Sequence, residues 1–298
     1  MRLPTGFSFI LAALVWTIGG LFVDRDNYPR DRRPSPLMET PRAEAPGIIR
    51  SRRDAQPEKV LPDISPGDPE ISVQWGTSGG NSTGTAFPVS SQGFWLTARH
   101  VVDDCTRVGI FSAQNAQKGF WVRKVYVHPN ADIAVLQTSR TPPAIAIRPD
   151  SKKLTVGQTG YHFGFPQGEP GDLLSELIGR RKLRKIGSHS FVEPAIAWAV
   201  KLQAPRLSAF GGISGGPVLD RKGQVVGVTV AGNIRRGRVI ASPPRTINEF
   251  LGFMSIMADG TPSADVPINT LNKSAFSAHG DFLRKNLSVA KVFCKGRV

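Results

Sequence analysis

The chain has 298 residues, 40% hydrophobic and 20% charged, which is the composition of a globular protein and excludes a largely disordered one. Its two cysteines exclude a disulfide-rich scaffold and a four-cysteine zinc site, while 31 glycines and 24 prolines favour a turn-rich β protein. The formal net charge is +15, and all of it lies after residue 70, because the single charge of residues 1–23, Arg2, is offset by the nine basic and ten acidic side chains of residues 24–70. A field of this sign serves solubility or attracts anionic partners.

The chain begins with an apolar segment, residues 1–23, that is uncharged between Arg2 and Asp24. As a helix its uncharged part would extend roughly 32 Å, enough to span a bilayer. It is either a signal anchor or a cleaved signal peptide, and we favour the anchor because Thr17-Ile18-Gly19 is a poor cleavage site. The arginines that follow the apolar segment argue that the chain after it stays on the cytoplasmic side of the membrane. We nevertheless expect export, with the protein anchored in the inner membrane facing the periplasm, or secreted, because so short an N-terminal segment resembles a secretion signal.

Residues 24–70 contain nine prolines and no apolar periodicity, which predicts a disordered linker. From residue 71 short β-rich runs alternate with turn residues, and their spacing favours an all-β sandwich or barrel over residues 71–255. The predicted strands are residues 85–89, 94–98, 107–111, 120–127, 133–137, 154–165, 196–202 and 225–231. A C-terminal extension, residues 256–298, contains one predicted helix at 277–287.

Three short motifs carry side chains suited to chemistry, in the order His, Asp, Ser. An apolar strand ends in His100, Asp132 opens another apolar strand, and Ser214 lies in the glycine-rich turn GGISGGP. Each motif alone is more often an ordinary turn or strand end. The three together in a β-rich domain predict a catalytic triad.

The chemistry of acyl transfer needs these three residue types. A serine hydroxyl requires an adjacent base such as His100, and that histidine requires a carboxylate such as Asp132 to orient it. Backbone N–H groups near the nucleophile stabilise the oxyanion, and we assign this role to the amides of Gly212 and Ser214.

The motifs TARHVV at 97–102, DIAVL at 132–136 and GISGGP at 212–217 resemble those of trypsin-like serine proteases with the chymotrypsin fold. The similarity is greatest to the bacterial Deg/HtrA-like group, here expected without a PDZ domain, and covers roughly residues 72–253. The resemblance implies two six-stranded antiparallel β-barrels with a short C-terminal helix. His100 and Asp132 would come from the first barrel and Ser214 from the second. Ile213 departs from the pattern, since many relatives have Asp or Asn before the serine.

The resemblance also implies where the substrate pocket lies. Its walls would come from the loop before the serine and from the strand after it, namely Ser208, Ala209, Phe210, Val228, Thr229 and Val230. No acidic residue occurs among residues 201–218 or 222–246, so we expect a neutral pocket for small or medium apolar side chains.

The expected partners are polypeptide substrates. The basic run at 180–185 and the smaller cluster at 235–238 form either solvated surface or a docking patch for an anionic membrane or envelope surface. We do not expect nucleic acid as a partner, because an exported protein seldom meets it. We do not expect a metal or a cofactor, because the remaining histidines lack the spacing of metal ligands. Cys105 and Cys294 are able to form one bridge in an oxidising compartment. The alternative function is a catalytically silent module that binds peptides or anionic surfaces.

Overall fold

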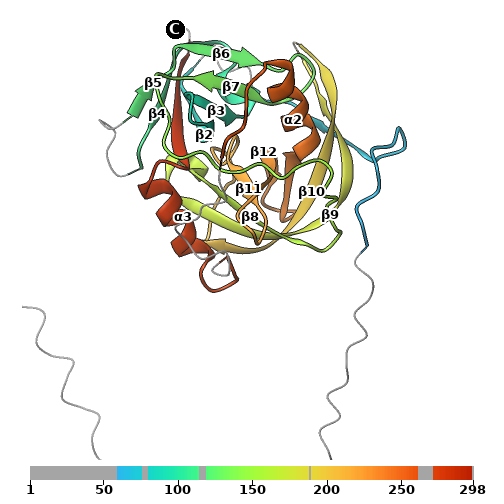
Figure 1. Ribbon diagram of the computed structural model, residues 1–298. Helices are drawn as coiled ribbons and strands as arrows, with labels where there is room; N and C mark the ends of the chain where they lie inside the picture. The colour runs from blue at the N-terminus through green and yellow to red at the C-terminus, as the bar shows by residue number, and fades with distance from the viewer. Residues whose placement is uncertain (1–58, 76–79, 114–118, 188, 261–270, 297–298) are drawn as a thin grey trace, which may run out of the picture. The chain divides into compact units, whose positions relative to one another are not determined.

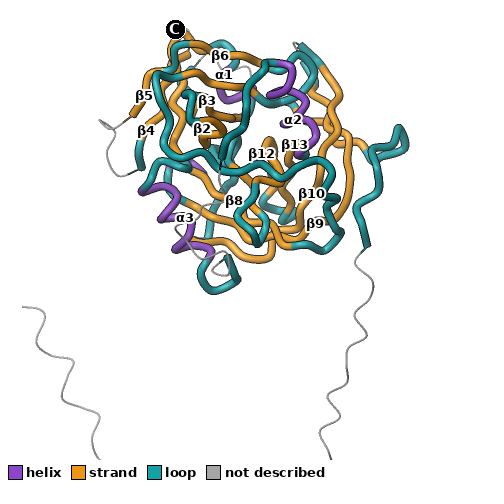
Figure 2. The backbone as a smooth tube through the Cα atoms, viewed as in Figure 1, coloured by secondary structure: helices purple, strands orange, loops and turns teal. Residues whose placement is uncertain are grey.

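The computed structural model describes residues 59–75, 80–113, 119–187, 189–260 and 271–296. The expected N-terminal anchor, and residues 24–58 of the expected linker, lie outside these residues. Within the described part, none of the helices is both long and apolar enough to cross a membrane. The fold is mostly β, as predicted. In Figure 2 the helices are short segments beside the strands.

The first sheet has seven strands in the order β5-β4-β14-β2-β3-β7-β6. Their bounds are β2 Ser82–Ser90, β3 Phe94–Thr97, β4 Cys105–Phe111, β5 Gly119–Trp121, β6 Lys124–Val127, β7 Ala134–Gln137 and β14 Ala290–Gly296. The edge strands β5 and β6 are separated by only two residues, so one bent segment contributes both edges of a curled sheet. The expected six-stranded barrel is therefore this curled sheet, with β5 and β6 as halves of one bent segment.

The strand β14 lies in the middle of this sheet although it comes from the end of the chain (Figure 1). It pairs antiparallel with β2 on one side and with β4 on the other. A disulfide joins Cys294 of β14 to Cys105 of β4, with their Cα atoms 5.5 Å apart. Residues assigned from sequence to a C-terminal extension thus belong to the centre of the first sheet.

The second sheet contains the closed six-stranded barrel that was expected. Its strands are β8 Thr159–Gly164, β9 Gly171–Lys185, β10 Phe191–Ala204, β11 Pro217–Leu219, β12 Val225–Asn233 and β13 Arg238–Ser242. The barrel closes because β8 pairs with both β9 and β11. A seventh strand, β1 Glu70–Val73, adds to the outside of β9 in parallel.

Several strands were missed from sequence: β1, β9, β11, β13 and β14. The strand β9 was missed because its C-terminal half is the basic run 180–185, which we read as surface loop or docking patch. In the structure this run is strand, and its side chains alternate between the two faces of the sheet.

The helices are α1 Arg99–Val102, α2 Pro244–Phe253 and α3 Phe276–Lys285, together with the 3₁₀ turn η1 Pro166–Gly168. The predicted C-terminal helix corresponds to α3. Its Arg284 forms a two-fold hydrogen-bonded ion pair with Asp172 of β9, at 2.6 and 2.9 Å. Both side chains are almost fully buried, so the pair fastens α3 to the second barrel.

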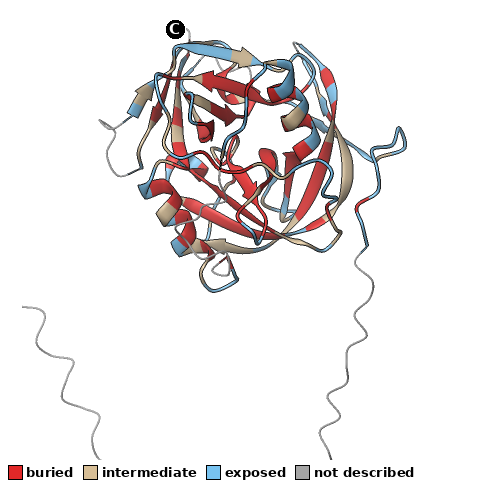
Figure 3. Ribbon diagram, in the orientation of Figure 1, coloured by how far each residue is buried: buried red, intermediate tan, exposed pale blue. Residues whose placement is uncertain are grey.

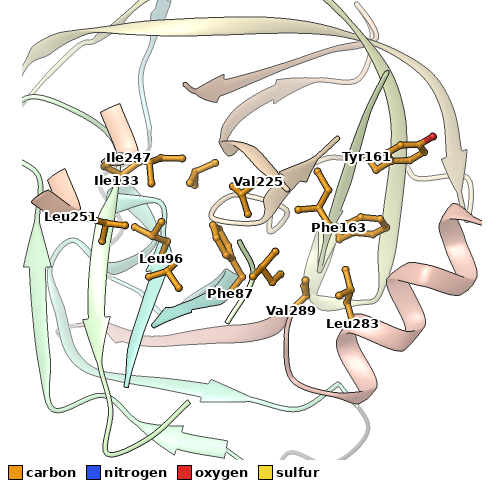
Figure 4. Packing of buried hydrophobic residues seen from close by; sticks show 14 of the residues in the cluster. Phe87, Leu96, Ile133, Tyr161, Phe163, Val225, Ile247, Leu251, Leu283 and Val289 are labelled. Carbon is orange, nitrogen blue, oxygen red and sulfur yellow. The ribbon is translucent and has the colours of Figure 1, made fainter. Parts of the chain in front are cut away.

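One apolar cluster joins the two sheets. It includes Phe87 and Leu96 of the first sheet and Phe163 and Val225 of the second (Figure 4). The helices α2 and α3 add further apolar side chains to it. Figure 3 shows that the inner strands are buried along most of their length, while the outer turns are exposed. Because the sheets share this core, the loops at their junction have a rigid support.

Candidate active site

The strand pair β3 and β7 brings His100 and Asp132 together. Thr97 at the end of β3 pairs with Ala134 at the start of β7, and the two residues of interest lie just beyond these ends. The His100 amide donates to Asp132 Oδ1 at 2.9 Å, and His100 Nδ1 lies 2.6 Å from Asp132 Oδ2. Because a carboxylate accepts, Nδ1 carries the proton and Nε2 is left as the basic nitrogen.

The loop that carries Ser214 is bound to strand β2 of the first sheet. The Thr85 amide donates to the Ser214 carbonyl at 2.8 Å, and the Thr85 hydroxyl donates to the Gly212 carbonyl at 2.8 Å. Thr97, three residues before His100, donates its hydroxyl to the Thr85 carbonyl at 2.7 Å. The serine loop and the segment leading to His100 are therefore attached to the same stretch of β2.

Ser214 is partly exposed, and its hydroxyl has no hydrogen-bond partner among the described residues. The structure thus makes the contact between His100 and Asp132 but no hydrogen bond between Ser214 and His100. In unliganded hydrolases such a bond is often long and tightens only when substrate binds.

Gly212 has a backbone conformation that favours glycine. Its φ is +96°, and a Cβ at this position would collide with the Phe165 carbonyl. The preceding carbonyl, of Gly211, accepts the Gln167 amide at 2.5 Å. In a trans peptide the N–H points opposite to the carbonyl, so the Gly212 N–H points away from Gln167. Within the described part of the chain, neither this amide nor that of Ser214 has an acceptor.

Ile213 lies on the inner side of this loop and is 1% exposed. It packs in a cluster with Leu173, Phe210 and Val239. An apolar contact therefore holds the serine loop at this position.

Residues 84–228 match the profile of the trypsin-like peptidase domain. The chain contains a trypsin-like peptidase domain. Curated proteins similar to it include the probable periplasmic serine endoprotease DegP-like of Pseudomonas putida (strain GB-1), 29% identical over 147 residues. A protein of the same description from Chlamydia trachomatis serovar D is 28% identical over 151 residues. These alignments cover 49% and 50% of this chain but only 28% of each relative.

A solved structure titled HtrA-type protease AlgW with decapeptide has a TM-score of 0.47 and 18% identity to this chain. The match covers 58% of this chain and 51% of the other.

The residues expected to form the pocket of the peptidase domain are unequally exposed. Ser208 is exposed and Ala209 is partly buried, whereas Phe210 is 5% exposed and packs against Gly232. Val228, Thr229 and Val230 are completely buried. Thr229 also contacts His162, a buried histidine whose pKa burial lowers to about 3. His162 is therefore neutral and structural. The backbone of Thr229 hydrogen-bonds to Gly215 and Gly216, directly after Ser214.

Two residues near the site were missed by sequence reasoning. Glu193 of β10 is 1% exposed, and its Oε1 accepts the Asp132 amide at 3.0 Å. Burial, and after it the charge of Asp132, raises the pKa of Glu193 to about 8. The only sequence signal was a lone acid shortly before the strand predicted at 196–202.

The second missed residue is Trp75, which lies two positions after β1. Its ring is stacked on that of His100, with centroids 4.7 Å apart and planes 8° apart. It was missed because its position next to His100 depends on β1, which the sequence did not reveal.

Proposed function

We propose that the peptidase domain is a serine endopeptidase with Ser214 as nucleophile, His100 as general base and Asp132 as the orienting carboxylate. The observation that carries this proposal is the double hydrogen bond from His100 to the buried Asp132. This contact leaves Nε2 as the acceptor, on a segment tied to the serine loop through Thr85.

In the proposed reaction His100 Nε2 removes the proton of the Ser214 hydroxyl as its oxygen attacks the peptide carbonyl. The amides of Gly212 and Ser214 donate to the oxyanion that forms. His100 then gives its proton to the departing amine, and the acyl group remains on Ser214. Water, deprotonated by the same imidazole, hydrolyses this ester and regenerates the hydroxyl. Asp132 stabilises the imidazolium in both halves of the reaction.

The proposed substrates are polypeptides with a small apolar side chain before the scissile bond. Supporting this, Phe210 packs against Gly232 and leaves little depth between the loop before Ser214 and strand β12. The pocket residues named above are also uncharged. A groove of about 350 Å³ is lined by residues including Phe165, Lys291 and Phe293, and we propose that it accommodates the part of the substrate beyond the scissile bond.

We place the protein in the periplasm or outside the cell. Disulfides such as that between Cys105 and Cys294 form and persist in oxidising compartments. The curated relatives named above are described as periplasmic. An inner-membrane anchor formed by residues 1–23 remains part of the proposal.

Labelling with a fluorophosphonate probe tests the catalytic assignment. The full chain should be labelled, Ser214→Ala should abolish the labelling, and Ser151→Ala should leave it in place because that exposed serine lies outside the proposed site. Labelling that survives in Ser214→Ala would contradict the assignment. A folded wild-type protein that is not labelled would favour the alternative, a peptide-binding module.

A further inference from the structure

We propose that Trp75 is a positioning residue for His100, brought to the catalytic centre by the segment 59–75, here called the N-terminal arm. This inference rests on the proposed function and adds to it a residue that lies outside the trypsin-like match. The indole ring lies flat on the imidazole, at the 4.7 Å separation given above, and also contacts Phe191, whose ring centroid is 6.5 Å away.

The arm is fastened to the second barrel along its whole described length. Leu61 is 1% exposed, and its amide donates to the Leu154 carbonyl at 2.7 Å. Farther along, β1 pairs in parallel with residues 182–185 of β9. The Ile186 amide then donates to the Val73 carbonyl at 2.9 Å. Trp75 follows only two residues after this last contact, so its position is set by the barrel.

The basic run of β9 supplies much of this fastening. Arg180 donates to the Pro62 carbonyl at 2.7 Å and Lys182 to the Pro66 carbonyl at 2.8 Å. Arg184 forms a two-fold contact with Glu70, at 2.6 and 2.9 Å. Three of the cations that the sequence indicated as surface or docking charge therefore bind the arm.

The stack restrains a motion that the hydrogen bonds to Asp132 leave open. Those bonds fix one edge of the imidazole, whereas the ring still rocks about that edge if its faces are free. A flat indole against one face blocks this rocking and excludes water from that side, and its π electrons attract the imidazolium that forms during acyl transfer. His100 retains 16% of its side-chain surface, which leaves room for the serine and the substrate.

The experiment compares Trp75→Ala, Trp75→Phe and a matched control, Trp121→Ala, in the full chain. Trp121 is a half-exposed tryptophan of β5 that contacts Arg107 and Phe111, so its removal tests for non-specific effects of losing an indole. The first readout is the NMR resonance of the proton shared between His100 Nδ1 and Asp132. The second is the rate of fluorophosphonate labelling at Ser214, divided into probe affinity and rate of bond formation. Thermal unfolding confirms that each variant is folded.

We expect Trp75→Ala to broaden or abolish the shared-proton resonance and to slow bond formation about tenfold with little change in probe affinity. Trp75→Phe should recover most of both, and Trp121→Ala should match the wild type. An unchanged resonance in Trp75→Ala would overturn the proposal. Faster labelling of Trp75→Ala would also overturn it, because it would show that the indole blocks access to Ser214. If the wild-type chain is not labelled at all, the proposed function fails, while the resonance still decides whether Trp75 holds the His100 ring.

Discussion

The buried carboxyl of Glu193 accepts the backbone amide of Asp132 at 3.0 Å, so an acid of the second barrel braces the loop that orients His100. Its other oxygen lies 3.1 Å from the Ser242 hydroxyl. Two negative charges side by side in this dry environment would repel each other. Burial and the Asp132 charge accordingly raise the pKa of Glu193 to about 8 and favour its protonated form at neutral pH.

Glu193 should make the stability of the protein fall as pH rises. The folded state binds the Glu193 proton more tightly than the unfolded chain does, because its pKa is raised from 4.5 to about 8. The stabilisation is therefore complete below about pH 4.5 and is lost as pH rises through about 8. Glu193→Gln keeps both hydrogen bonds and removes this dependence. Between pH 5, 7 and 9 the urea concentration at the midpoint of unfolding should decline less in the variant than in the wild type. Equal declines in the two proteins would contradict the raised pKa of Glu193. Glu176→Gln, a half-exposed acid of β9, is the control.

Gly212→Ala should disable the proposed oxyanion site without unfolding the protein. The new Cβ would collide with the Phe165 carbonyl and force the loop out of its φ of +96°, which moves the Gly212 amide. Loss of one such donor lowers turnover by about 100-fold, and we expect a similar fall in fluorophosphonate labelling. Gly211→Ala is the matched control, because a Cβ there meets nothing within 4 Å. Equal labelling rates for the two variants would argue against this site.

Arg284→Met should destabilise the second barrel strongly. It leaves Asp172 buried and unpaired beneath α3, which costs about 3–5 kcal/mol of unfolding free energy. Adding Asp172→Leu to this variant removes the orphaned charge and should restore much of the loss. Arg245→Met, which breaks the exposed pair with Glu249, should have little effect. Urea unfolding of the four proteins checks this, and a small loss in Arg284→Met would show that the buried pair matters little.

Removing the disulfide should loosen the first sheet. The bond joins Cys105 and Cys294 across 189 residues of chain and fastens β14 between β2 and β4. The double variant Cys105→Ala/Cys294→Ala should lose about 2–4 kcal/mol of unfolding free energy. The wild type in reductant should approach the same value, whereas the variant should not respond to reductant. Identical stability of the oxidised wild type and the variant would contradict this expectation.

The chain order of His100, Asp132 and Ser214, and the β-rich pattern around them, were sufficient to predict the fold class and a candidate site. Local pattern also located most strands of the first sheet and the helix α3. These features depend on short stretches of sequence, in which apolar alternation, glycine turns and motif residues occur close together.

The tertiary structure alone decided the features that join distant segments. The strand β14 enters the centre of the first sheet from the chain end, and β1 lies on the basic run of β9, because backbone pairing is independent of separation along the chain. Trp75 contacts His100, and Glu193 contacts Asp132, although each pair of residues lies far apart in the sequence. Sequence by itself determined which residue types were available for chemistry. Burial and strand pairing determined which of them share one site, because each depends on contacts between residues far apart in the chain.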